Sequence, residues 1–385
     1  MWLEADAPER LAALLADRGY RVIAPRVRDG ALVVAEVDGA AALPTGWYDE
    51  TGPGRYRLAR RPDSDPRAAE RFGFTIAAQA WKPFLHPPEV RLFRAERASG
   101  GSLRFTPEPP PERPLAFLGV RPCDLAAIGV QDRALTAAGA EDDVYAGRRQ
   151  GALLIVVECG RANATCFCAS MGTGPGARDG FDLALTELLD ADRHGFLARA
   201  GSDRGRALLE ELGARPASDL DLGERQRLLD ATARSMTREV DGEATRAALA
   251  AGAELPMWGS VAERCLTCGN CTLVCATCFC TTVRDTSDVA GGEAERWRSW
   301  DSCFGLEFSA IHGGTVRSSA AARYRQWLTH KLGSWHQQFG ESGCVGCGRC
   351  IVWCPVGIDI TAEAATAVRE AARSAETAAG RGGRG

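Results

Sequence analysis

Cysteine is the residue type that gives this sequence its chemistry. The chain carries 15 cysteines in 385 residues, and two runs of them share the spacing C-x₂-C-x₂-C-x₃-C. The first run is Cys265, Cys268, Cys271 and Cys275, and the second run is Cys344, Cys347, Cys350 and Cys354. This is the spacing of bacterial ferredoxins, in which three cysteines of a run bind one [4Fe–4S] cluster and the fourth binds the other cluster.

The spacing predicts two clusters whose ligands cross over. Three thiolates on a tight loop cap one face of a cubane, while the fourth cysteine points across a helical turn toward the neighbouring cluster. The first cluster is therefore expected on Cys265, Cys268, Cys271 and Cys354, and the second on Cys344, Cys347, Cys350 and Cys275. Zinc is the alternative, but a zinc site uses two separated cysteine pairs and has no need of the third and fourth cysteines of each run.

The other seven cysteines are grouped rather than scattered. The tetrapeptide Thr-Cys-Phe-Cys occurs at 165–168 and again at 277–280. Free cysteines are often small buried hydrophobic residues, which is the alternative for any one of them. As a set they predict a third [4Fe–4S] cluster that bridges the two parts of the chain, although spacing does not determine its ligands. The candidates are Cys166, Cys168, Cys278, Cys280 and Cys303, followed by Cys123 and Cys159, which come after predicted strands.

Motifs for a catalytic site are missing from the sequence. No Rossmann dinucleotide-binding fingerprint, in which GxGxxG joins a strand to a helix, and no P-loop is present, and the five histidines show no paired metal-binding spacing. The two separate cysteine pairs of a nickel–iron site are also missing, because the only C-x₂-C outside the two runs is Cys275 to Cys278. The sequence thus predicts electron transfer through iron–sulfur clusters, with no catalytic residue of its own.

Composition removes several classes of partner. The chain has 46 basic and 50 acidic residues and a net charge of −4, so electrostatics give no reason to expect nucleic acid as a partner. The longest aliphatic run, 152–157, is too short to span a membrane, and no signal peptide is visible. Abundant cysteine without an export signal favours metal chemistry in the cytoplasm over disulfides. Only Lys82 and Lys331 are lysines, a bias that we attribute to genomic base composition.

Hydrophobic patterning predicts an α/β N-terminal domain plus a mainly helical ferredoxin-like domain that binds two [4Fe–4S] clusters. Residues 1–114 are expected to be an α+β region of uncertain topology, and residues 115–255 an α/β domain with cysteine-bearing loops. Residues 256–377 are expected to be the dicluster domain with a long insertion, and residues 378–385 a disordered tail.

Individual elements follow from the same patterns. The apolar runs 115–120 and 153–157 are typical of buried parallel strands, and the periodicity predicts helices at 124–138 and 181–192. Residues 276–343 separate the two cysteine runs and are partly helical in pattern, especially 319–332. This favours a helical dicluster domain with an insertion over a small βαβ ferredoxin.

Several motifs in fixed order resemble a known family. They are Gly119-Val-Arg-Pro-Cys-Asp124, Glu158-Cys-Gly160, Thr165-Cys-Phe-Cys168, Trp300-Asp-Ser-Cys303 and the two ferredoxin runs. Over about residues 115–360 the chain resembles the iron–sulfur β subunit of cytoplasmic group 3 nickel–iron hydrogenases of the sulfhydrogenase type. It is also similar to the corresponding iron–sulfur component, the A subunit, of anaerobic sulfite reductase. It departs from the pattern at Ala276, where proline is usual, and at 314–317.

The resemblance implies a role in relaying electrons. A β subunit of this kind relays electrons between a flavin subunit that binds NAD(P)H and the hydrogenase small and large subunits. The alternative is the equivalent subunit of an anaerobic sulfite reductase or a related reductase, whose partner would be a reductase catalytic subunit. A cluster-based redox sensor is a third possibility, but the sequence has no basic recognition helix. Two clusters would give about eight iron atoms per chain and three would give about twelve.

Overall fold

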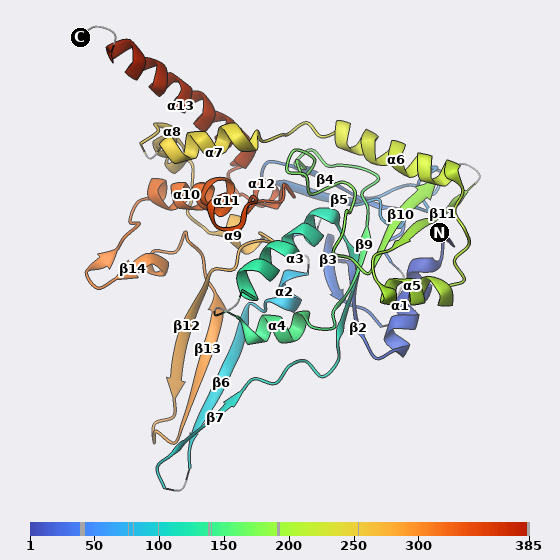
Figure 1. Ribbon diagram of the computed structural model, residues 1–385, viewed down its shortest axis with the longest axis horizontal. Helices are drawn as coiled ribbons and strands as arrows, with labels where there is room; N and C mark the ends of the chain where they lie inside the picture. Colours follow the sequence, from blue (N-terminus) through green and yellow to red (C-terminus); the bar gives the residue numbers. More distant parts are fainter. Residues whose placement is uncertain are drawn as a thin grey trace.

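The structure is a computed structural model that describes residues 1–382 apart from 39–42, 76, 80, 99, 138, 140, 191–192 and 253, with side chains up to residue 377. Within these residues the largest unit is a seven-stranded sheet with the order β1-β11-β10-β9-β8-β2-β3 (Figure 1). Its strands are β1 (Trp2–Glu4), β2 (Arg21–Arg28), β3 (Ala31–Glu36), β8 (Leu115–Val120), β9 (Leu153–Val157), β10 (Leu183–Leu189) and β11 (His194–Ala200).

The centre of this sheet is parallel and its edges are antiparallel. Strands β2, β8, β9 and β10 run in the same direction, whereas β3, β11 and β1 join in antiparallel pairs. The strands of the N-terminal region therefore share one sheet with the strands that follow residue 115. The boundary expected between residues 114 and 115 lies inside this sheet.

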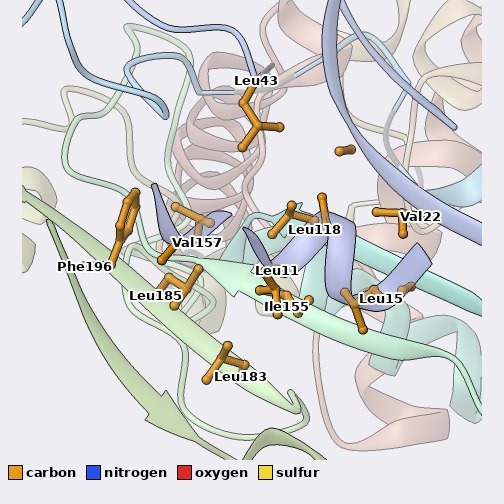
Figure 2. Packing of buried hydrophobic residues seen from close by; sticks show 14 of the residues in the cluster. Leu11, Leu15, Val22, Leu43, Leu118, Ile155, Val157, Leu183, Leu185 and Phe196 are labelled. Carbon is orange, nitrogen blue, oxygen red and sulfur yellow. The ribbon is translucent and has the colours of Figure 1, made fainter. Parts of the chain in front are cut away.

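Alternating side chains of the central strands build two cores. On one face, Leu118 and Ile155 pack with Leu11 and Leu15 of helix α1, and these two leucines are fully buried (Figure 2). Removing each of these leucines from water contributes about 1.5–3 kcal/mol. The helices beside the sheet are α1 (Ala7–Asp17), α2 (Lys82–Leu85), α3 (Pro122–Leu135), α4 (Asp143–Arg149), α5 (Asp203–Glu211) and α6 (Asp219–Arg234).

The opposite face of the sheet shares its core with the cysteine-rich C-terminal part. Phe117 and Val156 belong to the same buried cluster as Cys123, Ala276 and Val345. Because one continuous apolar core runs through both parts, the α/β unit and the dicluster region are packed together rather than tethered by a linker.

The C-terminal part is built mainly from short helices. Its elements are α7 (Gly242–Ala251), α8 (Met257–Ala262), α9 (Asn270–Leu273), η1 (Glu307–Ser309), α10 (Ala320–Thr329), the π-helix η2 (His330–Ser334), α11 (Trp335–Phe339), α12 (Arg349–Val352) and α13 (Ile360–Gly382). Helices α9 and α12 each start inside a ferredoxin run, after a glycine of positive φ, Gly269 at 75° and Gly348 at 76°. The two runs therefore fold alike, as their common spacing predicts.

A second sheet joins distant parts of the sequence. Its four strands have the order β12-β13-β6-β7, and they form the long arm that extends from the body in Figure 1. The strands are β6 (Glu89–Arg97), β7 (Leu103–Pro107), β12 (Thr281–Ser287) and β13 (Glu293–Trp300), and smaller pairs are β4 (Trp47–Gly52) with β5 (Arg55–Arg60) and β14 (Ala310–Ile311) with β15 (Gly314–Thr315). The insertion between the two cysteine runs thus begins as a hairpin that pairs with an N-terminal hairpin.

Most sequence predictions of individual elements near the site are confirmed. Strands β8 and β9 occupy the predicted residues 115–120 and 153–157, and α3 covers most of the helix predicted at 124–138. The helix predicted at 181–192 is wrong, since this segment forms strand β10. Leu183 and Leu185 face one core and Ala184 faces the other, so their apolar spacing reflects burial on both faces and not a helical period.

Helix α13 differs from the expectation at the C-terminus. It continues to Gly382, into the tail expected to be disordered from residue 378 on. Alanines at 378 and 379 extend the helix because alanine has the highest helix propensity. Residues 383–385 lie outside the described part of the chain. Among the described helices, none combines the length and the apolar character that crossing a membrane requires.

The loop at 165–168 contacts the second ferredoxin run backbone to backbone. The Phe167 N–H donates to the Gly346 carbonyl at 3.0 Å. A Cβ on Gly346 would lie 2.7 Å from the Cys168 backbone, and a Cβ on Gly348 would lie 2.2 Å from the Thr165 carbonyl oxygen. Only glycine allows this approach, since both positions also have positive φ.

Gly348→Ala should therefore destabilise the protein much more than Gly340→Ala. Both glycines have left-handed backbone (φ 76° and 74°), but a Cβ on Gly340 meets nothing within 4 Å. The left-handed conformation costs an alanine about 1–2 kcal/mol at either position, and the clash at Gly348 adds about 1–3 kcal/mol. Anaerobic urea unfolding of the two variants measures the difference. Equal losses would show that the loop contact adds nothing to stability.

Candidate metal centres

The first predicted cysteine set lines a single apolar pocket. Aromatic side chains of Phe304, Tyr324 and Trp327 form its other wall. The backbone N–H of Thr267 donates to Cys265 Sγ at 3.4 Å, and that of Ile358 donates to Cys354 Sγ at 3.3 Å. The pocket contains cysteines of both runs, namely Cys265, Cys268, Cys271, Cys350 and Cys354. Sulfur atoms that accept backbone N–H groups in an apolar enclosure suit an iron–sulfur cluster, whose potential depends on such hydrogen bonds and on solvent exposure.

The thiols of this set oppose one another's ionisation. Burial raises the pKa of Cys271, and the charges of Cys265 and Cys354 raise it further. The pKa of Cys265 is raised in the same way by burial and by Cys354 and Cys268. Four thiolates this close together need a positive centre, and binding a metal would release their protons.

The second predicted set also comes together. Burial raises the pKa of Cys344 to about 12 and raises those of Cys347 and Cys350. The charge of Cys275, from the first run, raises the pKa of all three of these thiols. The fourth cysteine of one run is therefore a neighbour of the three cysteines of the other. Cys275 itself differs, because a hydrogen bond from Cys278 and the Lys331 ammonium hold its pKa well below the usual range.

The remaining seven cysteines fall into two groups. The third group comprises Cys123, Cys159, Cys166 and Cys168. Cys123 lies in the first turn of α3 and Cys159 follows β9, so these two lie where parallel strands end, as expected for a ligand-binding edge. Burial raises the pKa of Cys166 to about 12, with a further rise from Cys159. Cys168 interacts with Cys159, Cys166 and Cys347.

The fourth group comprises Cys278, Cys280 and Cys303. A hydrogen bond from Cys303, followed by the Lys331 ammonium, lowers the pKa of Cys280 to about 7. Cys278 interacts with Cys275, Lys331 and Cys280. The two Thr-Cys-Phe-Cys segments therefore belong to different groups, whereas the sequence suggested that both supply one bridging centre. Cys123 and Cys159, the later candidates, both interact with Cys168, and Cys159 also interacts with Cys166.

The geometry of a cluster differs from that of a single metal ion. In the part of the chain that the structure describes, no three His, Cys, Asp or Glu side chains are close enough to hold one ion. A four-iron cubane has another requirement, because each of its thiolates binds a separate iron at a separate corner. The first, second and third groups follow one another in space. Cys350 of the second set interacts with Cys271 of the first set, and Cys347 of the second set interacts with Cys123 of the third group.

A buried ion pair joins the second run to the α/β unit. Arg349 donates two hydrogen bonds to Asp124, at 2.7 and 2.8 Å, and a third to the Ala77 carbonyl at 2.8 Å. The exposed fractions of the two residues are 1% for Arg349 and 3% for Asp124. Asp124 belongs to the helix turn that carries Cys123, and Arg349 lies between Cys347 and Cys350. The pair therefore positions cysteines of the second and third groups relative to each other.

Comparison with known proteins agrees with this geometry. Residues 264–358 match a family model described as a 4Fe-4S dicluster domain. The sulfhydrogenase 2 subunit beta of Pyrococcus furiosus is 34% identical over 248 residues, which is 63% of this chain and 71% of the relative. The chain belongs to the sulfhydrogenase beta-subunit family. No solved structure matches the chain.

Membership of this family confirms the resemblance predicted from the ordered motifs. Together with the dicluster match, it supports an iron–sulfur electron-transfer role for the chain. Sequence reasoning missed the charged residues that surround the cysteines, namely Asp124, Arg349, Lys82 and Lys331. For Lys82 and Lys331 the sequence did hold a signal, because they are the only two lysines in it.

Breaking the buried pair should be costly, whereas removing both charges should not. Arg349→Met leaves the Asp124 carboxylate buried without its partner, and we expect a loss of about 3–5 kcal/mol in the free energy of unfolding. The double variant Asp124→Leu/Arg349→Met should recover most of this loss. Anaerobic urea unfolding measures both.

The exposed pair Arg296–Asp285 is a matched control. Its partners are 2.7 Å apart, with 44% and 61% of their side chains exposed. Arg296→Met should change stability by no more than about 1 kcal/mol. A loss from Arg349→Met as small as this would show that the buried pair does not stabilise the contact between the two parts.

Proposed function

We propose that this chain relays electrons between a flavin subunit that binds NAD(P)H and the small and large subunits of a nickel–iron hydrogenase. The observation that carries the proposal is the series of three neighbouring cysteine sets, which extends from the pocket beside Trp327 to the edge of the α/β sheet. The name of the Pyrococcus furiosus relative supports a hydrogenase as the partner. The cytoplasm suits the proposal, because reducing compartments keep thiols available for clusters.

Within this proposal the two ferredoxin runs hold crossed [4Fe–4S] clusters, on Cys265, Cys268, Cys271 and Cys354 and on Cys344, Cys347, Cys350 and Cys275. When bound, such clusters accept and donate single electrons. The chain's own side chains shield them unequally from water. Phe304 and Trp327 line the pocket of the first set, whose Cys268 is exposed, whereas Val345 and Ile351 are buried beside the second. Solvent exposure is one of the factors that set the potential of such a cluster.

A third [4Fe–4S] cluster is proposed on Cys123, Cys159, Cys166 and Cys168. Its support is that these four cysteines are neighbours and that Cys347 of the second set interacts with Cys123, Cys166 and Cys168. The loop 165–168 also packs directly on the second run. A metal at this position would stabilise the folded junction, because binding to an organised site adds to folding free energy.

Purification of the intact complex tests the function. The full-length chain, tagged at its N-terminus and isolated anaerobically from its own host, should carry with it both a flavin subunit and one that contains nickel. NAD(P)H should then bleach the iron–sulfur absorbance. Siroheme in place of nickel would support the sulfite reductase alternative, and a chain that carries neither would contradict the relay.

The crossed assignment has its own test. Cys275→Ser should damage the cluster of the second run, although Cys275 belongs to the first run in sequence, because its sulfur lies beside Cys344 and Cys350. Cys265→Ser should damage the other cluster, and Cys354→Ser should reproduce the effect of Cys265→Ser. EPR of the reduced proteins separates the two signals. If Cys275→Ser and Cys265→Ser remove the same signal, the ligands do not cross.

A further inference from the structure

The two lysines of the chain are buried at the same place. Lys82 and Lys331 are the only lysines among 46 basic residues, and each has an exposed fraction of 5%. Lysine is among the residues that are least often buried. Base composition explains why arginine replaces lysine elsewhere in the chain, but it does not explain why both remaining lysines are internal.

Their ammonium groups face the cysteine-rich loop that follows the first run. Lys82 Nζ donates to the Cys275 carbonyl at 3.2 Å and lies 3.8 Å from the ring centroid of Trp300. Lys331 Nζ donates to Thr277 Oγ1 at 2.9 Å. In the region that the structure describes, neither ammonium group forms an ion pair with a carboxylate.

Two buried positive charges need negative charge nearby. An ammonium group loses much hydration free energy on burial, and only an anionic partner offsets the loss. Neutral thiols cannot provide this compensation. Metal-bound thiolates can, and a cluster of thiolate, iron and sulfide would carry net negative charge at this site.

Three cysteines outside the two ferredoxin runs lie in this loop or beside it. Cys278 and Cys303 are buried, with 9% and 8% of their surface exposed, and Cys280 is half-buried. The Cys280 carbonyl accepts the N–H of Asp301 at 2.8 Å, which holds the segments of Cys280 and Cys303 side by side. Gln131 donates to the Ala276 and Cys278 carbonyls at 3.0 and 3.4 Å. The loop is thus held rigidly from three sides.

We propose that Cys278, Cys280 and Cys303 hold an iron–sulfur cluster of their own, and that Lys82 and Lys331 balance its negative charge. On binding, each thiol releases its proton to solvent and exchanges its S–H bond for an S–Fe bond. Three thiolates then face two ammonium ions. This count rests on the proposed function, in which the other cysteines form three sets of four, so one iron of a four-iron cluster here has no cysteine ligand.

Lysine suits this position better than arginine. Its ammonium is a compact charge with three rotatable donors, whereas the guanidinium is a broad planar fork. Two such cations beside a cluster favour its reduced, more negative form. This site therefore accepts electrons more readily than it would without the lysines, whatever partners the chain serves.

Iron analysis of the full-length chain, purified anaerobically, tests the separate cluster. With four iron atoms per cluster, the chain should contain about sixteen, compared with about twelve if only three clusters exist. Cys303→Ser and Cys159→Ser should each lower the content by about four, and the double variant should lower it by about eight. A double variant that loses only about four would place both cysteines on one bridging cluster and overturn the proposal, as would no loss from Cys303→Ser.

The lysines are tested through the potential of the same centre. Lys82→Met should keep the iron content. The cluster whose EPR signal Cys303→Ser abolishes should then have a more negative reduction potential. An unchanged potential would show that the lysine does not balance a cluster. If Cys303→Ser fails to fold, as judged by loss of the ferredoxin signals, Cys280→Ser replaces it. A two-dalton mass decrease from a disulfide between Cys280 and Cys303 in the purified protein, without the additional iron, would also overturn the proposal.

Discussion

The contact on which the rest of the structure depends is the backbone-to-backbone packing of the loop 165–168 against the second ferredoxin run. Two glycines of positive φ make this approach possible, and the buried pair of Asp124 and Arg349 holds the neighbouring helix ends in place. The shared apolar core and the pairing of β13 with β6 also join the two parts of the chain, but this contact places the loop 165–168 directly on a cysteine run. With it, the sets become neighbours across a shared apolar core.

Charge is the second constraint. Burying many sulfur ligands in a low-dielectric interior is unfavourable unless cations oppose them. Among the described residues, cations beside the cysteines include Arg349 beside Cys347, Arg121 beside Cys159, and the two lysines beside the loop 275–280. Their distribution is uneven, because none of the groups acting most strongly on Cys271 is a cation, whereas Lys331 lies close to Cys275. A different local charge gives each set a different reduction potential. In this way a protein can order the potentials of otherwise similar clusters.

The cysteine spacing predicted the two ferredoxin sets because all of their ligands belong to a short local motif that occurs twice. The strands β8 and β9 were also predictable, since a short run of purely apolar residues has little alternative to a buried strand. The same feature misled the prediction for β10, whose apolar residues face two cores. Sequence could not show how the remaining cysteines divide, because Cys123 and Cys159 come beside Cys168, and Cys303 beside Cys280, only through tertiary packing. The pairing of the hairpin β12–β13 with β6 was likewise invisible, since no local signal records which edge strands meet.

The direct test of the relay is EPR of the intact complex, frozen within milliseconds of mixing with NAD(P)H. Neighbouring reduced clusters interact magnetically, so the account predicts broadened, spin-coupled signals from the two crossed clusters of this chain, and their loss in a complex that carries Cys354→Ser. If the flavin becomes reduced and the catalytic subunit turns over while the clusters of this chain remain oxidised, electrons travel by another route and the account is contradicted.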